Sequence, residues 1–256
     1  QGTDVVIPEG VKSIANNAFK NTELTSVVIP EGVRSIGSYA FSGTSLTSVQ
    51  LPSTLTSINR EAFRNTQLTG VVIPEGVNSI GREAFMGSAL TSVELPSTLT
   101  SIANDVFRDT QLTSVVIPEG VKSIGSAAFW GTPLTSVQLP STLTTIGGSS
   151  FRDTQLTSVV IPEGVTSIAS DAFTGTSLTS VQLPSTITTI GANAFDSDVA
   201  VNFVHTGTVT ISGTATEGEV LTAANTLADR DGLGTISYQW NRDGSTISGA
   251  TSSTYT

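Results

Sequence analysis

The sequence predicts an α/β repeat solenoid, rich in β-structure, made of nine 22-residue coils and followed by an incomplete all-β sandwich. Nine of the ten prolines and nine of the ten phenylalanines lie on a strict 22-residue grid without an insertion. The grid ends after Phe195, because position 206 is Thr206 and position 217 is Glu217. We therefore expect a solenoid over residues 1–203 and a second domain over residues 204–256.

Proline and phenylalanine mark fixed points of each repeat. The prolines are Pro8, Pro30, Pro52, Pro74, Pro96, Pro118, Pro140, Pro162 and Pro184, and the phenylalanines are Phe19, Phe41, Phe63, Phe85, Phe107, Phe129, Phe151, Phe173 and Phe195. A fixed period of this length is the signature of supersecondary units that stack on one another. Each unit is predicted to form one coil.

The repeat over residues 24–45 illustrates the expected coil. Apolar side chains alternate up to Pro30, which ends the strand because proline cannot donate to a β-ladder. A turn follows, and Ala40 and Phe41 are predicted to close a short helical turn. The expected inward-facing side chains are Leu24, Val27, Ile29, Val33, Ile36 and Phe41. One coil cannot bury these side chains alone, so neighbouring coils must stack.

A longer period lies on top of the first. Ile-Pro-Glu-Gly-Val at positions 29, 73, 117 and 161 alternates with Leu-Pro-Ser-Thr at positions 51, 95, 139 and 183. The duplicated unit is therefore predicted to contain 44 residues.

The repeat pattern resembles a known family. Leu46-Thr47-Ser48-Val49-Gln50-Leu51-Pro52, followed by Ile58 and Ala62-Phe63, is similar to the BspA-like leucine-rich repeat over residues 3–200. The resemblance implies a curved solenoid with a parallel sheet on its concave face, in a surface or secreted protein that binds other molecules. Where the family often has a cysteine three residues after the phenylalanine, this chain has threonine or serine, whose hydroxyl is expected to satisfy backbone groups of the turn.

The tail has a different character. Residues 207–244 show strand-like alternation with Gly and Asp turns. The run Gly232-Leu233-Gly234-Thr235-Ile236-Ser237-Tyr238-Gln239-Trp240 resembles the Ig-like repeats of bacterial adhesins over about 206–256. The resemblance implies a partial Ig-like stalk domain with Trp240 in its core, and neighbouring Ig-like domains in the full-length chain.

Composition excludes several function classes. The net charge is -10, with 11 basic and 21 acidic residues, so we expect neither nucleic acid nor an anionic membrane as partner. No apolar run is long enough to insert into a membrane. The chain has no cysteine, and its single histidine is His205, outside the repeats. We expect no enzyme, no cofactor and no metal, apart from a weak calcium signal at Asp229 and Asp231 for which an Asx-type turn is the favoured reading.

Two rows of side chains are the candidate binding sites. The sheet-face row is predicted to expose Gln50, Val72, Glu94, Val116, Gln138, Val160 and Gln182. The strip that follows the phenylalanines contains Arg64, Met86, Arg108, Trp130 and Arg152. Arg, Met and Trp are enriched at protein interfaces, and Trp130 between two arginines favours a cation-π stack.

Two other rows have plainer interpretations. Glu61, Glu83 and Asp105 share one register beside arginines, which favours a solvent-facing row of salt bridges over a catalytic pair of carboxylates. Threonine ladders, such as Thr25, Thr47 and Thr69, permit an ice-binding interpretation, although hydrogen bonding within the coils accounts for most of them.

These features predict a non-catalytic binding and spacer region of a large bacterial surface or secreted adhesin. We expect it to lie outside the cell or on the bacterial surface and to recognise a protein or glycan surface. The alternatives are an ice-binding solenoid, a structural filament or tail-fibre component and, as the least favoured, a carbohydrate-active enzyme.

Overall fold

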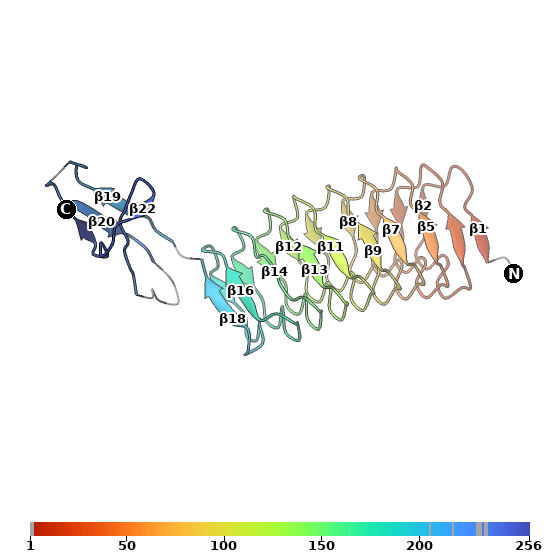
Figure 1. Ribbon diagram of the computed structural model, residues 1–256. Helices are drawn as coiled ribbons and strands as arrows, with labels where there is room; N and C mark the ends of the chain where they lie inside the picture. Colours follow the sequence, from red (N-terminus) through yellow and green to blue (C-terminus); the bar gives the residue numbers. More distant parts are fainter. Residues whose placement is uncertain (1–2, 205, 217, 229–231, 233–234) are drawn as a thin grey trace. The chain divides into compact units, whose positions relative to one another are not determined.

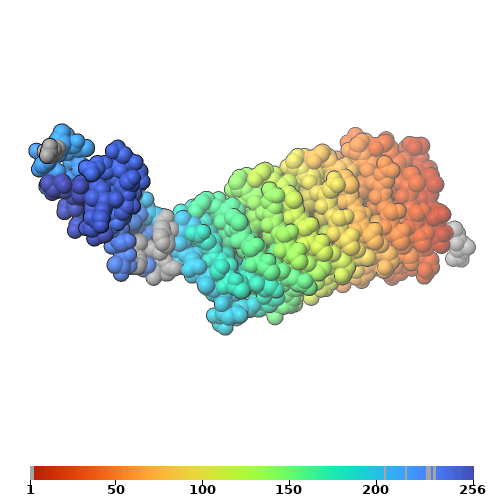
Figure 2. All heavy atoms as spheres, in the orientation of Figure 1, coloured from red at the N-terminus to blue at the C-terminus, as the bar shows by residue number. Residues whose placement is uncertain are grey.

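The computed structural model describes residues 3–204, 206–216, 218–228, 232 and 235–256. The chain divides into two compact units, Gln1–Val201 and Asn202–Thr256. The first unit is a parallel β-solenoid of about nine coils (Figure 1). In the space-filling view its colours follow one another in bands along the axis, because each coil adds one layer (Figure 2).

Each coil contributes a strand to one or both of two rows. The first row contains β1 (Asp4–Val6), β3 (Ser26–Val28), β5 (Ser48–Gln50), β7 (Gly70–Val72), β9 (Ser92–Glu94), β11 (Ser114–Val116), β13 (Ser136–Gln138), β16 (Ser180–Leu183) and β18 (Ala200–Phe203). The second row contains β2 (Ser13–Ile14), β4 (Ser35–Ile36), β6 (Ser57–Ile58), β8 (Ser79–Ile80), β10 (Ser101–Ile102), β12 (Ser123–Ile124), β14 (Thr145–Ile146), β15 (Ser167–Ile168) and β17 (Thr189–Ile190). Strands pair in parallel with a shift of one repeat, as Ser26 does with Ser48.

The core is a continuous stack that runs through the coils. The predicted inward-facing side chains of residues 24–45 are all buried. The nine phenylalanine rings stack in sequence, with centroids 5.2 to 5.7 Å apart and interplanar angles of 4 to 18°. The predicted stacking of coils is therefore confirmed, and each interior ring is sealed by its two neighbours.

The predicted helical turn is wrong, since no helix occurs in the described part of the chain. In the repeat over residues 24–45, Tyr39 and Gly43 have φ values of 60° and 69°, on either side of Phe41. These left-handed residues interrupt the right-handed geometry that a helix requires. The N–H groups of Tyr39, Phe41 and Gly43 instead donate to carbonyls of the next coil at 2.8 to 2.9 Å. Stacking of the coils therefore uses the hydrogen bonds that a helix would need.

The hydroxyls that replace the family's cysteine do satisfy the turn, as predicted. Thr66 and Thr110 are buried, and their Oγ1 atoms donate to the carbonyls of Phe63 and Phe107 at 3.0 and 2.8 Å. Each threonine therefore fixes the end of the segment that carries the core ring.

Ser150 is a buried polar residue at a position where most coils have alanine. It is fully buried, and its Oγ has no hydrogen-bond partner among the described residues. We expect Ser150→Ala to raise the free energy of unfolding by about 1 kcal/mol, because it removes an unsatisfied polar atom. Urea unfolding measures the effect. Thr154→Val is the control and is expected to lower the free energy of unfolding, since the Thr154 hydroxyl donates to the Phe151 carbonyl at 2.8 Å. A loss of stability in Ser150→Ala contradicts the prediction.

The second unit has an antiparallel sheet. It contains β19 (Val209–Ser212), β20 (Leu221–Asn225) and β23 (Thr254–Tyr255), with a separate hairpin of β21 (Asn241–Arg242) and β22 (Ser245–Thr246). Trp240 is half-buried, and its ring centroid lies 5.9 Å from that of Tyr255. Among the described residues of this unit only Ala223 is buried. The predicted sandwich is not seen in these residues, so the Ig-like resemblance stays a prediction.

A helix long and apolar enough to cross a bilayer was not found among the described residues.

Candidate functional site

The sheet-face row lies on the exposed side of the first row of strands. All seven of its predicted residues are exposed. Gln50, Val72 and Glu94 line a hollow of about 670 Å³ that crosses β5, β7 and β9. Glu94 and Val116 line a second hollow of about 340 Å³ toward β11. Gln138, Val160 and Gln182 follow along the same face, outside these hollows.

The strip after the phenylalanines contains the predicted stack of Trp130 between two arginines. The guanidinium carbons of Arg108 and Arg152 lie 4.1 and 5.2 Å from a ring centroid of Trp130. The Trp130 Nε1 donates to Asp153 Oδ2 at 2.9 Å. Arg64, Met86 and Trp130 are half-buried, and so are the two stacking arginines. Trp130 and its two stacking arginines are therefore held in place within the solenoid.

The row of carboxylates beneath the strip is not solvent-facing, which corrects the sequence-based expectation. Glu61, Glu83 and Asp105 are only 4%, 7% and 9% exposed. Their backbones have φ values of 54 to 59°, a left-handed conformation that is uncommon for residues other than glycine. Sequence reasoning placed them in a helical turn, and the absence of that turn explains the error.

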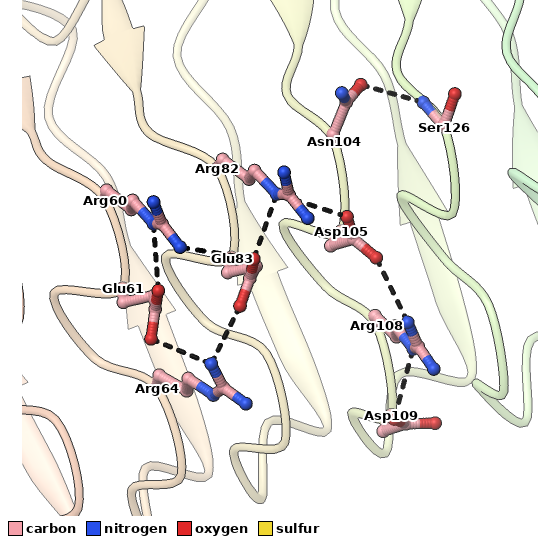
Figure 3. Close-up of polar contacts among 10 residues, drawn as sticks. All are labelled: Arg60, Glu61, Arg64, Arg82, Glu83, Asn104, Asp105, Arg108, Asp109 and Ser126. Carbon is pink, nitrogen blue, oxygen red and sulfur yellow. Dashed lines mark hydrogen bonds and ion pairs between the residues drawn. The ribbon is translucent and has the colours of Figure 1, made fainter.

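Arginines hold these carboxylates in a network that crosses three coils (Figure 3). Arg64 Nη1 lies 2.8 Å from Glu61 Oε2 and 2.8 Å from Glu83 Oε2. Arg82 Nε lies 2.9 Å from Glu83 Oε1 and 3.5 Å from Asp105 Oδ2. The buried charges are thus paired, as burial of an ionised group requires.

The hydrogen bonds to Glu61 do not favour a role as a general acid. Burial by itself raises the pKa of Glu61, but hydrogen bonds from Arg64, Tyr39 and Arg60 outweigh burial and hold its pKa below the ordinary glutamate value. A carboxylic acid catalyst needs a raised pKa. Glu61 is therefore an ionised anchor for arginines.

A group of three or more side chains that could hold a metal ion is not present among the described residues. The weak calcium signal at Asp229 and Asp231 lies outside the described residues, as does His205.

The two threonine rows use their hydroxyls differently, one within coils and one between them. One row is buried in the turns, as described above for Thr66 and Thr110. The other row is mostly exposed, and Thr91 and Thr135 donate their hydroxyls to the carbonyls one coil before, at 2.9 and 3.2 Å. Of these two rows, only the exposed one could bind ice, and some of its hydroxyls already donate hydrogen bonds to the preceding coil.

Two partners in the strip were missed from the sequence. Tyr39 hydrogen bonds to Glu61 and receives the Lys20 Nζ over its ring at 4.3 Å. Asp153 fixes the indole of Trp130. The recurrence of Arg-Asp-Thr-Gln at positions 108 and 152 was the available signal for Asp153.

Comparisons with known proteins give a consistent result. A family model described as BspA type Leucine rich repeat region, in 6 copies, matches residues 1–110 and 78–202. No curated protein matches the chain.

Solved structures with the same architecture come from several bacteria. A leucine-rich repeat protein from Bacteroides ovatus ATCC 8483 is 31% identical, with a TM-score of 0.72 over 78% of this chain and 55% of that chain. A leucine-rich repeat protein from Eubacterium ventriosum ATCC 27560 is 26% identical, with a TM-score of 0.58 over 62% and 46%. The T. pallidum Leucine Rich Repeat protein is 31% identical, with a TM-score of 0.53 over 59% and 76%. The chain spans about half the length of the first two structures.

Proposed function

Because the chain belongs to the BspA type leucine-rich repeat family, we propose that it is a non-catalytic binding and spacer region of a large bacterial surface or secreted adhesin. It recognises a protein or glycan surface, outside the cell or on the bacterial surface. In this proposal, neighbouring Ig-like domains of the full-length protein form a stalk next to the solenoid. Solenoids suit this role, since stacked repeats present long continuous surfaces.

The observation that carries the proposal is the ordered stack of Arg108, Trp130 and Arg152. Tryptophan and arginine dominate binding energy at protein interfaces when they are held in a fixed arrangement. Asp153 and the two arginines hold the indole, so a partner meets the ring edge and the guanidinium groups without first ordering them. Preorganisation of this kind lowers the entropy cost of association.

Binding to a glycan array and to a panel of purified matrix and serum glycoproteins tests the proposal. For any target that binds, we expect Trp130→Ala to weaken binding by at least about tenfold, the loss typical of a central aromatic anchor. Thr174→Ala is the matched control, because Thr174 occupies the same place in the coil of residues 156–177 and lies outside the stack. An equal loss in both variants contradicts a specific role for Trp130.

The competing functions give different results. Silence on every glycan and protein of the panel favours a structural filament or tail-fibre component. Thermal hysteresis that is lost on replacing Thr47, Thr69 and Thr91 by bulky residues favours ice binding.

A further inference from the structure

The near-identity of the coils makes unusual residues easy to recognise. In the outward row that begins at residue 26 and repeats every 22 residues to residue 180, Gly70 is the single departure from serine. In the Leu-Pro-Ser-Thr coils the other outward strand position is glutamine at 50, 138 and 182, and Glu94 is the single departure. Gly70 and Glu94 lie on adjacent coils, in the paired strands β7 and β9. Gly70 pairs with Ser92 and Val72 with Glu94, so the two departures lie near each other on a diagonal across the strands.

They also coincide with the 670 Å³ hollow of the sheet face. At Gly70 the serine side chain found on the other coils is missing, and a Cβ there would lie 3.1 Å from the Ser92 Oγ. Val72, which is 60% exposed, contributes apolar surface beside the gap, and Gln50 contributes an amide. The hollow crosses strands that lie side by side in Figure 1. The missing side chain thus opens a place for a ligand where other coils present a hydroxyl.

The charged residues that line the hollow are acidic. Glu31 and Glu94 line it, and no lysine or arginine is among the described residues that line it. The backbone N–H and the hydroxyl of Ser53 donate to the Glu31 carboxylate at 3.0 and 2.9 Å, and these bonds hold the pKa of Glu31 below the ordinary value. Glu31 is therefore a fixed anion at one end of the hollow.

The spacing of the two carboxylates indicates the shape of the ligand. Glu31 and Glu94 belong to coils three steps apart, which corresponds to a separation of about 14 Å along the solenoid axis at ordinary strand spacing. An extended peptide covers this length with about four residues. Aromatic side chains are absent from the described lining, so the hollow offers no stacking platform of the kind that Trp130 gives the strip.

We propose that this hollow binds a basic side chain of an extended peptide segment, with Glu94 as the anchor and the gap at Gly70 as the seat of the side chain. The inference rests on the proposed function and narrows its sheet-face part to one place and one ligand chemistry. It does not depend on the strip, whose partner is tested separately through Trp130.

Titration of the isotope-labelled chain with tetralysine, followed by NMR, tests the inference. We expect saturable shifts centred on the amides of Gly70, Val72 and Glu94. Gly70→Ser and Glu94→Gln restore the residues of the other coils, so both variants keep the repeat pattern. Glu94→Gln is expected to weaken tetralysine binding by about threefold to fivefold, the effect of one partly exposed ion pair. Gly70→Ser is expected to weaken tetralysine binding because the serine side chain fills the gap. Tetraglutamate is the ligand control and should cause no localised shifts.

Recreating the Gly70 and Glu94 arrangement on other coils distinguishes a specific binding site from general attraction of a basic peptide to an acidic chain. Gln138→Glu adds a carboxylate on a coil where Ser114 still fills the neighbouring position, and Ser114→Gly/Gln138→Glu recreates both features. We expect only the double variant to gain a second set of shifts, around residue 114. Equal binding to all variants, shifts spread over every carboxylate, or no shifts near Gly70 overturns the inference. Such results would leave target binding through Trp130 unaffected, so the two proposals fail independently.

Discussion

Phe107→Ala is expected to lower the free energy of unfolding of the solenoid by about 3–5 kcal/mol, the range for a large buried side chain cut to alanine. Phe107 is fully buried, and its ring stacks on Phe85 at 5.7 Å and on Phe129 at 5.5 Å. The substitution leaves a gap in the middle of the stack, where neither neighbouring coil can close in without breaking its strand pairing. Urea unfolding measures the loss.

The position of the gap also affects cooperativity. Stability of a solenoid is a sum of repeat and nearest-neighbour terms, so a weakened interface in the centre divides the stack into two blocks. We expect a broader transition and a lower urea dependence of the free energy, since each block exposes less surface on its own. Phe19→Ala is the matched control, because the half-buried Phe19 ring stacks on Phe41 at one end of the solenoid. A loss in Phe107→Ala no larger than in Phe19→Ala contradicts continuous stacking as the source of stability.

The 22-residue grid was enough to predict the architecture. Because Phe41 and Phe63 recur at a fixed step, their place in a shared core follows from geometry alone, and the structure confirms it. The grid also placed Trp130 between Arg108 and Arg152, since residues one repeat apart lie on adjacent coils. Periodicity therefore predicts which residues are neighbours along the axis.

Periodicity does not predict the conformation within a coil. The left-handed backbone at Tyr39 and Glu61 arises because alternate N–H groups bond to the next coil, a demand that no local propensity expresses. The same conformation accompanies the burial of the Glu61 carboxylate, which a surface interpretation had excluded. The hollow at Gly70 likewise depends on what neighbouring side chains leave open. These features come from stacking, so they could not be derived from one repeat.

Arg64→Met is expected to lower the free energy of unfolding by about 2–4 kcal/mol at neutral pH, since Glu61 and Glu83 lose their shared half-buried partner and keep only the more exposed Arg60 and Arg82. Arg64 Nη1 is shared by Glu61 and Glu83, whose side chains are only 5% and 9% exposed. Methionine keeps most of the aliphatic packing, so the loss reports the missing charge. Arg82→Met is the control: Arg82 is 57% exposed, and Glu83 keeps its bond to Arg64. Its loss should stay within about 1 kcal/mol.

The loss of unfolding free energy in Arg64→Met should depend on pH, and the lowered pKa of Glu61 sets the direction of that dependence. In the native chain the pKa of Glu61 is lowered from its ordinary value of 4.5, so its ionised form stabilises the fold above that pH. This contribution disappears as pH falls through the lower folded value. Without the Arg64 hydrogen bond, burial acts on Glu61 with less compensation, and we expect the pKa of its carboxyl to rise. The difference between native chain and variant is therefore largest at neutral pH and shrinks as the pH falls below the ordinary glutamate value of 4.5, where Glu61 takes up a proton. Unfolding curves at several pH values measure it. A pH-independent difference would mean that Arg64 stabilises the solenoid through packing, with no part played by its charge.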